Sequence, residues 1–133
     1  MSVLRRFLQL SMAERLLLGR ALLALLFVRL WLPFASLERL EQWARPAKAR
    51  PQPLASIVWA VRSCARRLPG TTCLPAALVL QRLLAAGGHE SELHIGVAQE
   101  AGGLGAHAWV VRDGEVLIGG QTQAAYASLM HWK

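Results

Sequence analysis

A chain of 133 residues, 54% of them hydrophobic, is long and apolar enough for one domain with a buried core. Its charge is uneven: residues 1–70 contain twelve basic and three acidic residues (+9), and residues 71–133 contain three and five (−2). An acidic peptide or a membrane surface suits the basic half, whereas nucleic acid is not expected, because the arginines are scattered among leucines without an aromatic-basic surface. Two cysteines make no disulfide framework and the chain does not start like a secreted protein, so the cytoplasm is the expected compartment.

The first half is predicted to be helical. Ser11 and Glu14 have the spacing of a capping box, which predicts a first helix over residues 11–32 with Pro33 ending it. Apolar residues lie almost all the way round this helix, which predicts burial on several sides. Two more helices, with a proline-containing linker that ends at Pro53 between them, are expected over residues 37–43 and 55–67.

The first helix also has to be tested as a membrane span. Arg20 and Arg29 interrupt it, and the longest uninterrupted apolar run, residues 21–28, is too short for a bilayer, which needs about twenty residues. A buried or amphipathic helix is therefore predicted. Peripheral contact with a membrane surface, or docking against a partner, stays open for so apolar a segment.

The second half is predicted to be mixed. The expected order is a helix over 74–86, a strand over 92–99, a glycine-rich loop over 101–105, a strand that opens at His107, a two-residue turn at Asp113-Gly114 and a return strand over 115–118. This is an α+β layout, with residues 1–53 as a helical region and linker and residues 54–133 as the core domain.

The residue best placed for chemistry is Cys73, at the expected start of the helix over 74–86. Backbone N–H groups at a helix start favour a thiolate, the nucleophilic form of cysteine, and can later hold an oxyanion. The other cysteine, Cys64, lies within the apolar pattern of the third helix and is expected to be a buried small residue.

His107 is the expected general base for that thiol, because it lies on a strand next to the helix start. Trp109, on the same strand face, would shield the imidazole from water. His89 is expected in a solvated loop, His94 on the strand face opposite Leu93, and His131 carries little information.

A third group should orient the imidazole. If Asp113-Gly114 forms a two-residue turn, the residue numbers of paired positions on the two strands add up to 227 throughout the hairpin. His107 then lies opposite Gly120, and Gln121 is the nearest side chain able to orient the imidazole. Metal-ligand spacings such as CxxC or HExxH are absent from the sequence, and so is a phosphate-cradling glycine loop, so no metal or cofactor is expected.

Several short motifs follow one another in a characteristic order: RLP at 67–69, CLPAAL at 73–78, LHIGV at 93–97, AHAWV at 106–110 and IGG at 118–120. Together with the helical, arginine- and leucine-rich first half, this pattern resembles the transglutaminase-like proteases of lasso-peptide maturation.

The resemblance implies a transglutaminase/papain-like core: a helix carrying the cysteine, packed on a small antiparallel sheet carrying the histidine. It implies a cysteine protease that removes the leader segment from a ribosomally made precursor peptide, with Cys73 as nucleophile and His107 as general base. The family commonly has an acidic residue after the second hairpin strand. Here that region reads Gly119-Gly120-Gln121, so the third role is assigned to Gln121.

The expected partners follow from the same resemblance. A precursor peptide with its leader is the substrate, a separate leader-binding protein presents it, and a cyclase resembling asparagine synthetase, which would use the ATP, closes the ring. Two other functions stay open: transfer of the acyl group to an amine by the same residues, and a non-catalytic helical scaffold that binds peptides.

Overall fold

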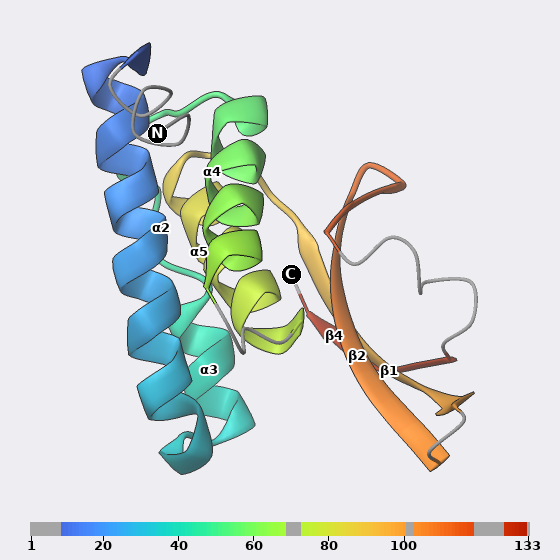
Figure 1. Ribbon diagram of the computed structural model, residues 1–133. Helices are drawn as coiled ribbons and strands as arrows, with labels where there is room; N and C mark the ends of the chain where they lie inside the picture. Colours follow the sequence, from blue (N-terminus) through green and yellow to red (C-terminus); the bar gives the residue numbers. More distant parts are fainter. Residues whose placement is uncertain (1–8, 69–72, 101–102, 119–126, 133) are drawn as a thin grey trace.

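The structure is a computed structural model that describes residues 9–68, 73–100, 103–118 and 127–132. Helices form one layer and a small antiparallel sheet forms the other (Figure 1). The helix that begins at Cys73 lies between the remaining helices and the sheet. The predicted α+β class, with the cysteine-bearing helix packed on the histidine-bearing sheet, is confirmed.

The first long helix, α2 (Met12–Trp31), begins at the predicted capping box. Ser11 Oγ accepts a hydrogen bond from the Glu14 N–H at 3.2 Å, and Glu14 Oε1 accepts one from the Ser11 N–H at 3.1 Å. At the other end, Pro33 lies in a single 3₁₀ turn, η1 (Leu32–Phe34), because proline lacks the N–H that would continue the helical ladder.

The two sides of α2 differ in burial. Its inner side, which packs on other helices, contributes Leu17, Ala21, Leu25 and Val28 to the core. Its outer side is also apolar but faces solvent: Leu16, Leu23 and Leu30 are 59%, 68% and 77% exposed. The prediction of burial on several sides is therefore wrong, because α2 lies on the side of the helix layer away from the sheet (Figure 1).

Residues 12–34 form a helix long and apolar enough to cross a membrane by length and composition alone. Its apolar stretch has a mean hydropathy of 1.8, and 22% of that stretch is buried. The sequence argument from the short uninterrupted run does not exclude a span on these criteria. The criteria themselves are weak evidence, since core helices and signal sequences also meet them. The cytoplasmic compartment stays a prediction.

The next two helices are α3 (Leu37–Trp43) and α4 (Leu54–Arg67). Ser36 Oγ caps α3 by accepting the Arg39 N–H at 3.3 Å. The guanidinium of Arg82 lies 4.7 Å from the centre of the Trp43 ring and donates to the Trp43 carbonyl, which ties the end of α3 to the helix that follows α4.

That helix, α5 (Cys73–Ala86), is the centre of the fold. Ten of its fourteen residues are buried, because α2 and α4 pack against it on one side and the sheet packs against it on the other. Gly87 and Gly88 follow it, as predicted, and Gly88 has the left-handed backbone angle φ of 89° that favours glycine at a helix end.

The sheet has the order β3-β2-β1-β4 among the described residues, and each neighbouring pair is antiparallel. The strand predicted to start at His107 begins earlier, so Gly103 to Gly105 pair with the first strand instead of forming a loop. The last strand was not predicted. The bounds are Glu92–Glu100 (β1), Gly103–Arg112 (β2), Glu115–Ile118 (β3) and Ala127–Trp132 (β4).

The β2–β3 hairpin turns as predicted, but its register is not constant. Asp113 and Gly114 both have positive φ, 50° and 82°, as a two-residue turn that follows the twist of the strands requires. Val111 pairs with Val116, a sum of 227, whereas Val110 pairs with Ile118, a sum of 228. The predicted constant sum is therefore wrong, because an extra residue in β3 shifts the register between Val110 and Val111. Gly120, which was predicted to lie opposite His107, lies outside the described residues.

One hydrophobic core joins the helices to the sheet, from Leu17 on α2 to Leu93 on β1 and Val110 on β2. The expected division of the chain at residue 53 stays a prediction, and buried side chains on both sides of it belong to this core.

Two glycines give a matched test of the helix packing. A Cβ added at Gly19 would meet nothing within 4 Å, so Gly19→Ala should raise the free energy of unfolding by about 1 kcal/mol through helix propensity. A Cβ at Gly87 would lie 2.9 Å from Ile57 Cδ1 and 3.2 Å from the Leu83 carbonyl oxygen. Gly87→Ala should therefore lower the free energy of unfolding, by about 1–3 kcal/mol. Urea unfolding measures both; equal shifts of the same sign would contradict the packing described here.

Candidate active site

Cys73 is the first residue of α5, and its sulfur contacts the sheet. The N–H of Ala108, on β2, donates a hydrogen bond to Cys73 Sγ at 3.2 Å. The thiol is half-buried and is not in a disulfide. The helix start thus brings the predicted nucleophile to the residue that directly follows the predicted base.

On the side of β2 where this contact forms, the described part of β3 pairs with only a few residues. Among the described residues, β3 pairs with β2 only from Val110 to Arg112. Ala108 lies beyond that pairing, so no described residue of β3 lies opposite it, and its N–H reaches the sulfur. The start of α5 therefore meets β2 at a residue that no described residue of β3 pairs with.

His107 is half-buried and directly precedes Ala108 on β2. It pairs with Gly96 on β1, which has no side chain to crowd the imidazole. Because side chains alternate along a strand, His107 and Trp109 share one sheet face, as predicted, while Ala108 faces the core. The structure thus places the two main predicted residues, Cys73 and His107, in adjoining positions.

An aromatic pair on that same face was not predicted from the sequence. The rings of His94 and Trp109 are stacked, with centroids 5.6 Å apart and planes 8° from parallel, and the two residues are cross-strand partners. His94 Nε2 also lies 3.2 Å from Glu92 Oε2. The sequence feature that could have predicted this pair is the alternation of Glu92, His94 and Gly96 along β1. It places these residues beside Trp109 and His107 only once the β1–β2 register is known.

The other residues considered in the sequence lie away from this contact or outside the described ranges. Gln121, the predicted orienter of the imidazole, lies outside the described residues. His89 lies in the segment after α5, where its Nε2 contacts the Gln52 carbonyl oxygen at 2.6 Å. His131 is on β4 and pairs in register with His94. Within the described ranges, no three His, Cys, Asp or Glu side chains are grouped closely enough to hold a metal ion.

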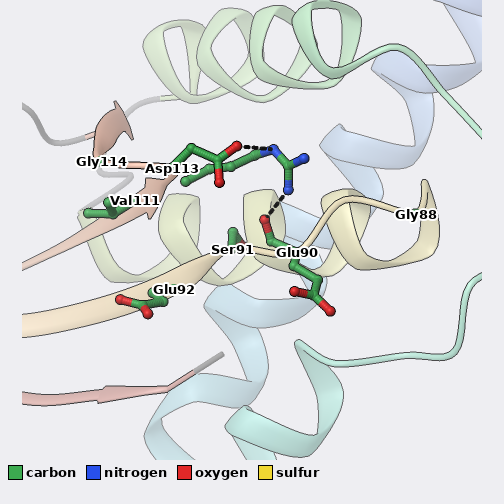
Figure 2. Close-up of a pocket in the computed structure, with 8 residues that line it drawn as sticks. Gly88, Glu90, Ser91, Glu92, Val111, Asp113 and Gly114 are labelled. Atoms are coloured by element: carbon green, nitrogen blue, oxygen red, sulfur yellow. Dashed lines mark hydrogen bonds and ion pairs between the residues drawn. The ribbon is translucent and has the colours of Figure 1, made fainter.

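A polar hollow of about 590 Å³ lies elsewhere on the molecule (Figure 2). Arg112 lines it, donating a hydrogen bond to the Glu90 carbonyl and pairing with Asp113 at 3.9 Å. Gly88, which follows the C-terminal end of α5, also lines it. Since Cys73 is at the other end of α5, roughly 20 Å away by helix rise, this hollow is separate from the Cys73 site.

Cys64 is half-buried on α4 and packs against the core, with its sulfur 3.5 Å from the Leu18 carbonyl oxygen. Burial raises the pKa of the Cys64 thiol above its ordinary value of 9.0, and the positive charge of Arg67 lowers it by a smaller amount. A thiol held in its neutral form is a poor nucleophile. Its surroundings therefore match the structural role predicted for Cys64.

A comparison with known protein families identifies the superfamily of this chain. A family model described as the transglutaminase-like superfamily matches residues 16–131. The chain belongs to the transglutaminase-like superfamily. The superfamily generally includes cysteine-type enzymes, which supports a catalytic role in general terms. A search of curated proteins and of solved structures gives no significant match.

The Cys64 thiol of this superfamily member should lose its proton at higher pH in the folded protein than in the unfolded chain. Because the pKa of Cys64 is raised, the rate of its alkylation by iodoacetamide should still increase with pH above pH 9.0. The midpoint of this increase should lie at higher pH than for the same thiol in urea-unfolded protein. The folded state keeps the Cys64 proton to higher pH than the unfolded state does. The neutral thiol therefore contributes its full stability below the pKa of Cys64 in the unfolded chain, and this contribution is lost as pH rises through the pKa in the folded protein. Peptide mapping by mass spectrometry follows the Cys64 adduct.

Arg67→Gln is the control for this assignment. It removes the charge that favours the thiolate, so the midpoint of Cys64 alkylation should move to still higher pH. A midpoint in the folded protein at or below that of the unfolded chain would contradict the burial of this thiol.

Proposed function

We propose that this protein is a cysteine peptidase that removes the leader segment from a ribosomally synthesised precursor peptide during lasso-peptide maturation. The observation that carries the proposal is the contact of Cys73 Sγ with the Ala108 N–H at 3.2 Å, next to His107. A thiol at the start of a buried helix, facing a strand that carries a histidine, is the arrangement that nucleophilic catalysis by cysteine needs. Membership of the transglutaminase-like superfamily supports it.

In the proposed reaction, His107 takes the proton of the Cys73 thiol and the sulfur attacks the scissile carbonyl carbon. The N–H groups of Cys73 and Leu74, in the first turn of α5, have no partner within the helix and would bind the oxyanion of the tetrahedral intermediate. The C–N bond breaks as His107 returns the proton to the leaving amine, which leaves a thioester on Cys73. Water, deprotonated by His107, then hydrolyses the thioester and restores the thiol.

The partners proposed for this reaction are those that the family resemblance implies. A separate leader-binding protein would present the precursor, and a cyclase resembling asparagine synthetase would use the freed amine.

The amide of Gln121 stays our proposal for the group that orients His107. Replacing Gln121 by Ala should then lower kcat more than it changes KM.

Replacement of the nucleophile tests the proposal directly. Cys73→Ala and His107→Ala should each lower leader cleavage by about 10³-fold or more, since the residues of a catalytic unit act together. Mass spectrometry of a precursor peptide incubated with the protein and a leader-binding partner measures the cut. Cys64→Ala is the matched control, because it removes the other thiol, which is half-buried and away from the sheet.

Two outcomes would contradict the peptidase. Retained cleavage by a folded Cys73→Ala variant would remove the nucleophile from the mechanism. A product joined to an added amine, such as glycine methyl ester, in place of a hydrolysed one would favour acyl transfer. If wild type neither cuts nor transfers while the partner is bound, a non-catalytic peptide-binding scaffold is the remaining function.

A further inference from the structure

An apolar groove runs between α2 and α4, on the helix layer. It has a volume of about 510 Å³, and its walls include Leu18 and Leu22 from α2 and Trp59 from α4. Leu22 and Trp59 are 39% and 37% exposed, so large apolar side chains face the solvent at its margins. Nothing in the proposed reaction uses this surface, since Cys73 is not among the residues that line it.

Gly19 lines the groove without a side chain of its own. It belongs to the lining, and a Cβ added there would find no atom within 4 Å. A glycine in the middle of an exposed helix costs stability relative to alanine, so its own helix gains nothing from it. Without a side chain at this point, another backbone or a large apolar side chain can approach α2 closely.

The exposed side of α2 continues the groove with a regular repeat. Its apolar positions alternate at spacings of four and three residues, which is the heptad pattern of a helix that packs along another helix. The seam residues are Met12, Leu16, Gly19, Leu23, Leu26 and Leu30. Among them, Leu16, Leu23 and Leu30 are more than half exposed. Gly19 belongs to both the seam and the groove, so the two form one surface.

The charges around this surface are all of one sign. Arg15, Arg66 and Arg67 line the groove, and no carboxylate is among its described lining residues. On α2, Arg20 and Arg29 are exposed beside the seam. The only acidic residue in the sequence from 12 to 34 is Glu14, and its carboxylate caps the helix by bonding to Ser11.

We infer that the α2–α4 groove and the adjoining seam of α2 are a docking surface for an amphipathic helix of another protein, with acidic residues flanking its apolar side. The heptad seam matches a helix, the gap at Gly19 admits a large side chain, and the arginines match carboxylates. A second copy of this chain is disfavoured, because it would bring the same arginines face to face. The inference does not rest on the proposed peptidase function.

The test uses two synthetic helical peptides of about three heptads, both with Leu at the a and d positions. One has Glu at e and g, the other Lys, so each repels itself and stays available for binding. Fluorescence anisotropy with the full-length protein should show the Glu peptide binding about tenfold more tightly than the Lys peptide. Its affinity should fall as salt screens the charges.

Charge-reversal variants locate the binding. Arg20→Glu with Arg66→Glu, at the seam and the groove, should weaken the Glu peptide about tenfold and strengthen the Lys peptide. Arg39→Glu with Arg62→Glu makes the same change of net charge at exposed positions of α3 and α4 outside the groove, and should change neither affinity. Cys73→Ala should bind the Glu peptide as wild type does, whatever its activity.

Four results would overturn the inference. The first two are that neither peptide binds, or that both peptides bind with equal affinity. The protein forms a concentration-dependent dimer that Leu23→Gln abolishes, which would make a second copy the occupant. The protein sediments with phosphatidylglycerol vesicles through Arg20 and Arg66 while the peptides do not bind, which would make an anionic membrane the occupant.

Discussion

The burial of α5 on both sides is the constraint on which the other features depend. Only Arg82 among its fourteen residues carries a charge, and that guanidinium is occupied by Trp43 of α3. The helix therefore cannot turn about its axis or slide along it without exposing apolar surface or uncovering the ring. Because Cys73 is its first residue, core packing also fixes the position of the thiol against β2. The packing of α5 in the core is therefore enough to hold the Cys73 thiol in this position.

The α2 helix has a different relation to the core. One side contributes Leu17 and Leu25, both nearly inaccessible, and the other keeps an apolar seam in solvent. A monomeric domain gains no stability from such a seam, and large exposed apolar patches usually mark a contact with something else. The two halves thus differ in proposed role as well as in charge: α2 carries the proposed docking surface, and α5 and β2 carry the proposed nucleophile and base.

Local signals predicted most of the elements. The capping box at Ser11, Pro33, Gly87 and the Asp113-Gly114 turn each act within a few residues, and the structure has a helix end or a turn at each of them. What the sequence could not predict depends on pairing between distant segments. The extra residue in β3, the strand β4 and the stacking of His94 on Trp109 all follow from strand register, which no local pattern specifies. The adjoining positions of Cys73 and His107 were predicted from a cysteine at a helix start and a histidine on a following strand, and the family resemblance implies the same pair.

The two kinds of pairing in the sheet also differ in the length of chain that they close. In the β2–β3 hairpin, Arg112 pairs with Glu115 across two residues, whereas β4 pairs with β1 across a long excursion, as between Leu93 and Trp132. Closing a two-residue turn costs little chain entropy and is fast, while joining distant segments is slower. The hairpin can therefore assemble early, and β4 is expected to be the last strand to join. The strand that meets Cys73 would then be in place before the edge of the sheet is complete.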